Sequence, residues 1–317
     1  KRKSDLIEIH NRPLYLKYLV NSLKNKNYIL YFHNDPLTMN GSRTLSERVF
    51  LLKNCFRIIF NSNWSKRKFL RNMKSDYINS EKLFVINQSA KKSIVNLKSK
   101  KNTITFVGKL NKAKGYDIFG NAIIKVLNKH KEWSATVIGD EPRDKLKFNH
   151  KKLNILGFIN HKKVINIYKK TSIAVVCSRW EEPFGRTSLE AAANGCAVII
   201  SNRGGLKETI TNGVIMKKLN HINLFNEVEN LIKNKKKREN LQRLSLKNFY
   251  LSHSYVSKKI DRVRDQSFKL VKKFNIKKKI SLRVLHVTNF NERHDGRLFF
   301  NTGRRINNGF IRQGNSV

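Results

Sequence analysis

Acidic residues are scarce in this sequence, and long apolar runs are missing. The 317 residues include 66 Lys and Arg but only 22 Asp and Glu, so the formal net charge is +44. No apolar stretch approaches the roughly 18 residues that a membrane-spanning helix requires. Lys1–Lys3 is basic, but Asp5, Glu8 and His10 follow where a signal peptide would have its apolar core. We therefore expect neither a membrane-spanning helix nor a signal peptide. Because the chain does not begin with Met, we expect its true N-terminus to be missing.

Cysteine is also rare, and the three cysteines do not form a metal-binding pattern. Cys55, Cys177 and Cys196 show no Cys-x-x-Cys spacing, and the last two flank apolar runs. We expect buried, reduced thiols, which fits a reducing cytoplasm. The sequence lacks a zinc-finger pattern, an RNP box and a helix-turn-helix that would direct its charge to nucleic acid. We favour two other origins of the charge: coding bias, and attraction to an anionic membrane surface, where each Lys or Arg contributes about 1 kcal/mol.

The overall pattern is that of an α/β protein. A hydrophobic content of 39% is ordinary for a globular chain, and 317 residues suffice for about two domains. Apolar runs alternate with helix-like stretches, which predicts parallel sheets with crossover helices. In the first half we predict strands over 5–9, 28–32, 57–60 and 83–86 and helices over 14–24 and 46–53. In the second half we predict strands over 103–107, 135–138, 153–156, 173–177 and 197–200.

The most informative stretch runs from Ser178 to Ser201. It follows a buried strand, turns through Glu182-Pro-Phe-Gly185 and enters a short Ala-rich helix. A Gly beside a helix N-terminus offers free backbone N–H groups to a diphosphate. Glu182 lies on the loop and Glu190 inside the helix, with seven residues between them. A loop carboxylate can reach sugar hydroxyls and a helix carboxylate can reach a ribose, so the arrangement suits a nucleotide-diphospho-sugar.

This stretch resembles the Glu-x7-Glu motif of the family 4 retaining glycosyltransferases. The resemblance implies the GT-B fold, in which two Rossmann-like domains with parallel sheets face each other across a cleft, the first domain being incomplete here. It also implies that Phe184, Gly185, Arg186 and Glu190 bind the donor and that Glu182 is catalytic. The alternative is a strand–turn–helix that carries two solvated glutamates.

A second motif, Phe106 to Tyr116, places Lys109 and Lys114 beside a short loop at a strand end. Two cations at the carboxyl edge of a parallel sheet can neutralise a diphosphate leaving group. The family has Arg and Lys here, so the resemblance assigns both lysines to donor binding and Lys114 also to catalysis. Lys109 stands where Arg is usual, which keeps the charge but loses the bidentate fork. The alternative is two solvated lysines on a loop.

Further site residues follow from the same resemblance. His33, at a strand end, matches a histidine that in relatives faces the donor sugar, and we assign it a catalytic contact near the anomeric carbon. His10 and Asn34 are candidates for the acceptor or sugar side. Phe158 lies in a turn that matches the one whose backbone often holds the nucleotide base. The alternative for His33 is a structural histidine, and the alternative for the turn at Phe158 is an ordinary turn. For Gly204-Gly205 we favour a role in supporting the fold.

The tail carries a strong strand over 282–288, then a loop and a predicted helix through Arg305. It is similar to the opening of another glycosyltransferase of the same family. We predict a partial acceptor-side domain over 1–95 and a nucleotide-sugar-binding domain over 96–265. A basic linker over 266–281 would then lead to the first strand, loop and helix of a second copy, 282–317. A circular permutation, in which the tail completes the first sheet, is the less favoured alternative.

The combined prediction is a retaining glycosyltransferase that transfers a sugar from a nucleotide-diphosphate-sugar to a hydroxyl of a glycan or lipid-linked acceptor. The process would be cell-surface polysaccharide or lipopolysaccharide synthesis. No Asp-x-Asp triplet stands at a strand end of the donor half, so we expect no metal, and no cofactor because the nucleotide-sugar is a substrate. We expect a cytoplasmic protein, or one peripheral on the inner face of the cytoplasmic membrane, without a nucleic-acid partner. The alternatives are a GT-B-fold nucleotide-sugar epimerase and a non-enzymatic, basic nucleic-acid-binding protein.

Overall fold

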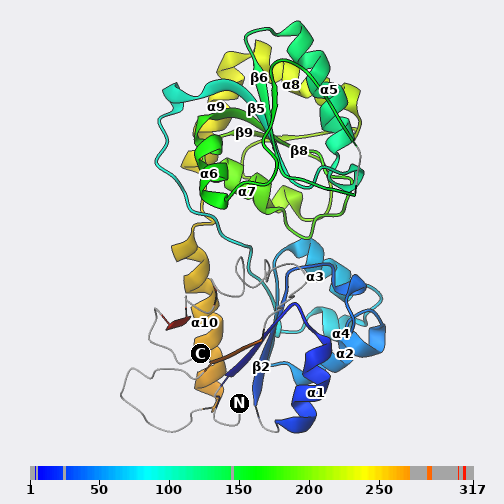
Figure 1. Cartoon of the computed structure of the whole chain (residues 1–317). Coiled ribbons are helices and arrows are strands. Elements are labelled where there is room, and N and C mark those ends of the chain that lie inside the picture. The colour runs from blue at the N-terminus through cyan, green and yellow to red at the C-terminus, as the bar shows by residue number, and fades with distance from the viewer. Residues whose placement is uncertain are drawn as a thin grey trace. The chain divides into compact units, whose positions relative to one another are not determined.

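The computed structural model describes residues 4, 6–23, 26–143, 146–271, 284–287, 306 and 310–311. The chain divides into two compact units, one made of residues 1–87 and 257–317 and the other of residues 88–256. Each unit is an α/β structure built on a parallel sheet (Figure 1). The predicted α/β class with two Rossmann-like units is therefore confirmed.

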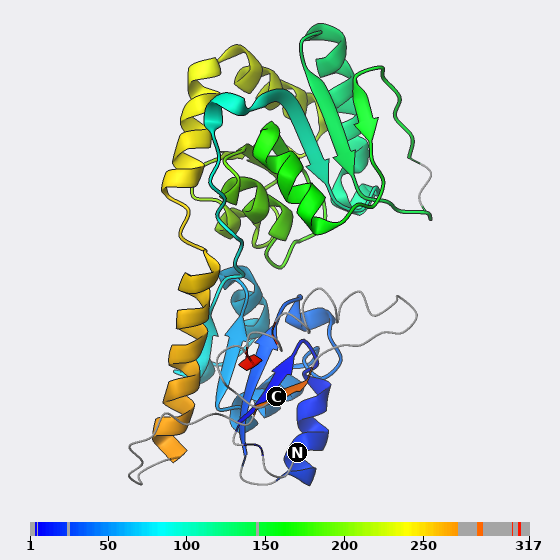
Figure 2. The same cartoon turned by 60° about the vertical axis from the view of Figure 1, so that its left-hand side comes forward.

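The first unit has a five-stranded sheet with the order β11-β1-β2-β3-β4, in which all neighbours pair in parallel. The strands are β1 (Leu6–His10), β2 (Asn27–Phe32), β3 (Arg57–Phe60), β4 (Leu83–Val85) and β11 (Val284–Val287). The helices are α1 (Leu14–Ser22), α2 (Leu45–Asn54), α3 (Asn63–Leu70), α4 (Ser75–Ile78), the short η1 (Pro36–Thr38), and α10 (His253–Val271) from Ser257 onward. Helix α10 lies on one face of the sheet, and α1 to α4 lie on the other (Figures 1 and 2).

Side chains alternate along β1 and β2, and this alternation determines which residues lie on each face of the first sheet. Successive residues of a strand point to opposite faces. Ile7, Ile9, Leu30 and Phe32 belong to the buried apolar cluster that also contains residues of α1, α2 and α3. The residues between them, Glu8 and Tyr31 among others, therefore face α10. This polar face of an otherwise apolar sheet is where the histidine sites predicted from the sequence lie.

The second unit has a six-stranded sheet with the order β10-β9-β8-β5-β6-β7, again parallel throughout. The strands are β5 (Lys101–Val107), β6 (Ser134–Ile138), β7 (Leu153–Ile155), β8 (Thr171–Val176), β9 (Ala197–Ile200) and β10 (Val214–Ile215). The helices are α5 (Tyr116–Lys129), α6 (His161–Lys170), α7 (Arg186–Ala193), α8 (His221–Lys233), α9 (Lys235–Lys247) and the short η2 (Leu97–Ser99), η3 (Lys112–Lys114) and η4 (Leu206–Thr209). One apolar cluster packs α5 and α8 against one face, and another packs α6 and α7 against the other (Figure 1).

The predicted strands and helices agree with these bounds to within two residues at each end. Local chemistry accounts for several of the helix starts. Thr44 caps α2 in a capping box with Glu47, and the Asn160 side chain caps α6. Among the described strands, β10 was not predicted, because its two residues carry too short a pattern to be read from the sequence.

The tail differs from the expectation that it stands apart from the first sheet. Within the predicted strand 282–288, Val284–Val287 forms β11 and pairs with β1 in parallel register, Leu6 opposite Val284. The physical reason is that β1 is buried along its whole length and has backbone groups to satisfy on that side. The predicted helix through Arg305 lies outside the described residues. The predicted linker 266–281 begins inside α10, and the second-copy interpretation of the tail stays a prediction.

Candidate functional site

Two loops of the second unit meet at the carboxyl edge of its sheet. Strands β5 and β8 are parallel neighbours, so the loops that follow them leave the same edge. The backbone N–H groups of Arg179 and Trp180 both donate to the carbonyl of Ala113, each over 2.9 Å. Gly115, at φ +73°, comes so close to the end of β8 that a Cβ would lie 1.9 Å from the carbonyl oxygen of Cys177. A residue with a side chain does not fit there, so glycine is what allows the two loops to meet.

This meeting of the loops places Lys114 against Glu182. Lys114 Nζ donates to Glu182 Oε1 over 2.5 Å, and Glu182 is 9% exposed. Behind the carboxylate, the Gly205 N–H donates to the Glu182 carbonyl over 2.6 Å. A Cβ on Gly204, at φ +57°, would lie 2.1 Å from that carbonyl oxygen. The two glycines therefore shape the loop that carries Glu182, which agrees with a structural role for them.

Glu190 is fixed inside α7, which begins after Gly185 at φ +112°. Its Oε1 accepts hydrogen bonds from His161 Nε2 over 3.0 Å and from Arg186 Nη2 over 2.8 Å. Burial opposes the charged form, but the His161 hydrogen bond and the Arg186 charge together lower the pKa of Glu190 below its ordinary value. Glu190 is thus a carboxylate held between α6 and α7. The sequence reasoning missed His161, and its position at the first turn of a helix was the only available signal.

The other residues predicted to bind the donor differ in their exposure and in their contacts. Phe184 is only 2% exposed, whereas Phe158 is 65% exposed beside its turn. Lys109 Nζ lies 3.9 Å from Glu141 Oε2. Glu141, which the sequence reasoning also missed, accepts two hydrogen bonds from Arg143, and these are the main reason that its pKa is lowered to about 2.

These groups give the edge a definite chemical character. The first turn of α7 has no side chain capping its N–H groups, and Lys114 stands on the neighbouring loop, so both can meet an anion. Glu182 and Glu190 are acceptors for hydroxyl groups. Within the ranges that the structure describes, no three His, Cys, Asp or Glu side chains converge as metal ligands.

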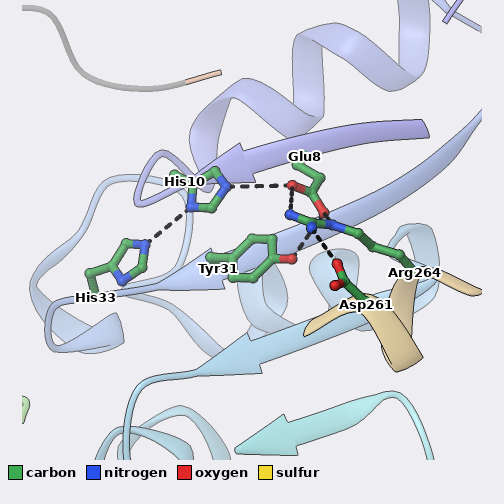
Figure 3. A network of polar contacts seen from close by, with 6 residues as sticks. All are labelled: Glu8, His10, Tyr31, His33, Asp261 and Arg264. Carbon is green, nitrogen blue, oxygen red and sulfur yellow. Dashed lines mark hydrogen bonds and ion pairs between the residues drawn. The ribbon is translucent and has the colours of Figure 1, made fainter. Parts of the chain in front are cut away.

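The first unit brings together two of its three sequence-predicted residues. His10 Nδ1 lies 3.2 Å from His33 Nε2, and the His10 ring stacks on Tyr31 with centroids 4.2 Å apart (Figure 3). Burial, and then the neighbouring His10 and His286, lower the pKa of His33 from 6.5 to about 3. Asn34 is exposed, and its backbone N–H donates to the Asn11 side chain over 3.2 Å.

A parallel sheet with helices on both faces and with a glycine-started helix, a lysine and two held carboxylates at its carboxyl edge has the architecture of a Rossmann-like unit. A second parallel α/β unit in the same chain makes the fold GT-B. The family described as "Glycosyl transferases group 1" matches residues 63–246, which is 184 of the 317 residues, and the chain belongs to this family.

Individual relatives cover smaller parts of the chain. The sequence is 30% identical over 162 residues to spore coat protein SA of Bacillus subtilis, covering 46% of this chain and 43% of that protein. It is 34% identical over 116 residues to the lipopolysaccharide core biosynthesis mannosyltransferase LpcC of Rhizobium leguminosarum, covering 33% of each. The chain therefore spans less than half the length of these curated relatives.

Solved structures show the same fold at low sequence identity. HepE of Anabaena in complex with UDP-glucose superposes with a TM-score of 0.63 at 16% identity, covering 85% of this chain and 79% of that one. A glycosyltransferase from Rickettsia africae gives a TM-score of 0.68 at 21% identity, covering 84% and 77%. Among the described helices, none has both the length and the apolar composition to cross a bilayer.

Proposed function

We propose that this protein is a family 4 retaining glycosyltransferase that moves a sugar from a nucleotide-diphosphate-sugar to a hydroxyl of a glycan or lipid-linked acceptor. The observation that carries the proposal is the contact between Lys114 and Glu182, 2.5 Å apart on two loops that meet beside the first turn of α7. A cation, free N–H groups and a carboxylate stand together at the sheet edge where Rossmann-like units bind nucleotides.

Each group has a distinct task in this proposal. Lys114, with Lys109 and the N–H groups of α7, stabilises the negative charge that grows on the leaving diphosphate, so that no metal is required. Glu182 orients the sugar through its hydroxyls, and Glu190 holds the ribose. Retention of the anomeric configuration would follow from attack on the same face of the sugar that the diphosphate leaves.

The relatives suggest which ligands to try first. One curated relative is a lipopolysaccharide mannosyltransferase, and HepE was solved with UDP-glucose. We propose a role in polysaccharide or lipopolysaccharide synthesis, with a UDP- or GDP-sugar as the donor.

The decisive experiment is a transfer assay on the purified protein with UDP-, GDP- and ADP-sugars and a panel of glycan and lipid-linked acceptors. The expected result is acceptor-dependent release of nucleoside diphosphate and a product with the donor's anomeric configuration. Conversion of the free donor without an acceptor would identify an epimerase. Salt-sensitive binding of nucleic acid with no response to any nucleotide-sugar would favour the basic binding protein.

A matched pair of variants makes the assay specific. Lys114→Met removes the amine at the site, and Lys125→Met removes the same charge from the exposed surface of α5. We expect Lys114→Met to lose transfer and Lys125→Met to retain it. Equal activity of the two would remove Lys114 from the diphosphate site.

We also propose that the protein binds the inner face of the cytoplasmic membrane through its positive charge, which is +44 over the chain. Anionic lipid attracts Lys and Arg within about a Debye length, so the attraction weakens with salt. Vesicles containing phosphatidylglycerol should sediment the protein at low salt and release it at high salt. Absence of binding, or binding that salt does not change, would contradict this part of the proposal.

A further inference from the structure

We propose that Glu8 and His10 are positioning residues that hold His33 in a single tautomer, with the lone pair of its Nδ1 kept for a hydroxyl group of the sugar. The inference deepens the proposed function and rests on it for the identity of the ligand. The inference gives a role to Glu8, Arg264 and Tyr31, none of which takes part in the donor-side chemistry.

The side chains concerned share one face of the first sheet. Glu8 and His10 are two residues apart on β1, and Tyr31 and His33 hold the same relation at the end of β2, so the period of a strand brings all four to the side that α10 covers. Figure 3 shows the four side chains in a row, with Arg264 of α10 at one end and His33 at the other.

Glu8 is the fixed charge at one end of this row. It is fully buried, and its carboxylate accepts from Arg264 Nε over 2.8 Å, from Arg264 Nη2 over 3.0 Å and from the Tyr31 hydroxyl over 2.9 Å. Burial alone would raise the pKa of Glu8, but the charge and hydrogen bonds of Arg264, together with the nearby His10, bring it down to about 2. Asp261, one turn away on α10, accepts from Arg264 Nη1 over 3.0 Å and keeps the guanidinium in place. Glu8 is therefore an anion at any ordinary pH.

The anion sets the direction of the hydrogen bonds that follow. His10 Nε2 lies 3.8 Å from Glu8 Oε2, and a carboxylate attracts the N–H of an imidazole rather than its lone pair. His10 then carries its proton on Nε2 and presents a lone pair at Nδ1. The partner of that lone pair is His33 Nε2, 3.2 Å away, which must supply the N–H.

His33 is left with its Nδ1 unprotonated. In the described part of the chain this Nδ1 is buried and has no hydrogen-bond partner. Among the described residues His10 Nε2, at the other end of the row, is likewise buried without a hydrogen-bond partner, so the charge of the Glu8 carboxylate 3.8 Å from it is what decides between the two tautomers. Burial and the nearby imidazoles of His10 and His286 keep the His33 ring neutral by lowering its pKa to about 3.

A neutral nitrogen lone pair selects one class of ligand. It accepts a hydrogen bond from a hydroxyl, and it repels phosphate and carboxylate oxygens, which at neutral pH are mainly acceptors themselves. Under the proposed function, the ligand of His33 is therefore a hydroxyl of the donor sugar or of the acceptor, and the diphosphate does not suit this position.

The test reads the tautomer directly, by NMR of the full chain with ¹⁵N-labelled histidine. In the wild-type protein we expect His33 to show a protonated Nε2 and a bare Nδ1. In Glu8→Gln the amide can donate to His10 Nε2, which reverses the row and moves the His33 proton to Nδ1. The matched control is Tyr31→Phe, which removes a donor to the same carboxylate, keeps its charge and should leave the tautomer unchanged.

Kinetics supply the second readout. If the lone pair receives a sugar hydroxyl, Glu8→Gln should lower kcat/KM for transfer about tenfold, the value of one lost hydrogen bond, while UDP binding stays at its wild-type level. If Glu8→Gln does not fold, His10→Phe keeps the ring stacked on Tyr31 but removes the acceptor, and should give His33 as a mixture of tautomers.

Two results would overturn the inference. One is a wild-type His33 protonated on Nδ1, and the other is a folded Glu8→Gln whose His33 tautomer and transfer rate equal those of the wild type. A protein with the expected tautomer but no transfer to any acceptor would instead refute the proposed function and leave the hydrogen-bond row standing.

Discussion

Replacement of Gly115 by Ala tests whether the two loops of the donor site meet as described. The new Cβ would stand 1.9 Å from the carbonyl oxygen of Cys177, and the residue would have to keep φ at +73°. The left-handed conformation costs an L-residue about 1–2 kcal/mol, and overpacking of a close contact adds about 1–3 kcal/mol. We therefore expect the second unit to lose about 2–5 kcal/mol of its free energy of unfolding.

Gly157→Ala is the matched control for this prediction. Gly157 has a similar φ, +62°, but a Cβ there would meet nothing within 4 Å, so only the conformational cost of about 1–2 kcal/mol remains. Hydrogen exchange of the β5 and β8 amides in increasing urea reports on the second unit alone. To relieve the clash, the loop that carries residue 115 must move away from the end of β8, which separates Lys114 from Glu182. UDP affinity should therefore also fall in Gly115→Ala. Equal destabilisation by the two substitutions would refute the close approach of the loops.

Four further outcomes follow from the same structure. Glu190→Gln should weaken UDP binding in calorimetry by about 1.5–3 kcal/mol, the value of a charged hydrogen bond, and unchanged affinity would remove Glu190 from the ribose site. Glu182→Gln should reduce transfer strongly while UDP still binds, whereas equal loss of both would make Glu182 structural. Transfer should survive EDTA, and complete loss that magnesium or manganese restores would contradict a metal-free mechanism. In acid, the first unit should lose stability. The unfolded chain protonates His33 near 6.5 and the folded one only near 3, so the free energy of unfolding falls as pH drops below 6.5. The Glu8 contribution is present above pH 4.5 and is lost toward pH 2. A His33 that titrates near 6.5 in NMR would contradict this.

Much of the fold was readable because its signals are local. A run such as Ala197–Ile200 between Gly195 and polar residues is a buried strand in almost any parallel sheet, and the structure gives it those bounds. Capping residues such as Thr44 likewise mark a helix start within a few positions. These features depend on neighbours in the chain, and the sequence displays them directly.

The donor site was only partly readable because its contacts depend on strand order. The sequence identified Lys114 and Glu182 separately, but their contact arises because β5 and β8 are adjacent in the sheet. Strand order is a property of packing, and no local pattern encodes it. For the same reason the sequence did not indicate that Lys109 lies 3.9 Å from Glu141, and the donor role of Lys109 stays a prediction.

The polar row of the first unit was missed for a different reason. Glu8 looks like an interruption in an apolar strand, and its partner Arg264 is 256 positions away. A buried carboxylate carries no sequence signal of its own until the cation that neutralises it is known. His10 and His33 were found only through a resemblance, and that resemblance gave no indication of what orients them.

Strand β11 shows how one long-range pairing can decide a whole region. The sequence predicted its strand but favoured a tail that stands apart, since one strand and one helix bury little apolar surface by themselves. That argument treats the tail alone, whereas in the structure β11 pairs with β1, which is fully buried. The parallel register of this pairing places Glu8 opposite His286. Without a neighbour on that side, β1 would be an edge strand with unpaired backbone groups next to a buried carboxylate. Pairing with β11 removes that cost, and the same pairing brings the His286 ring to the edge of His10, with centroids 4.8 Å apart. The strand that completes the sheet is therefore also the one that extends the histidine cluster.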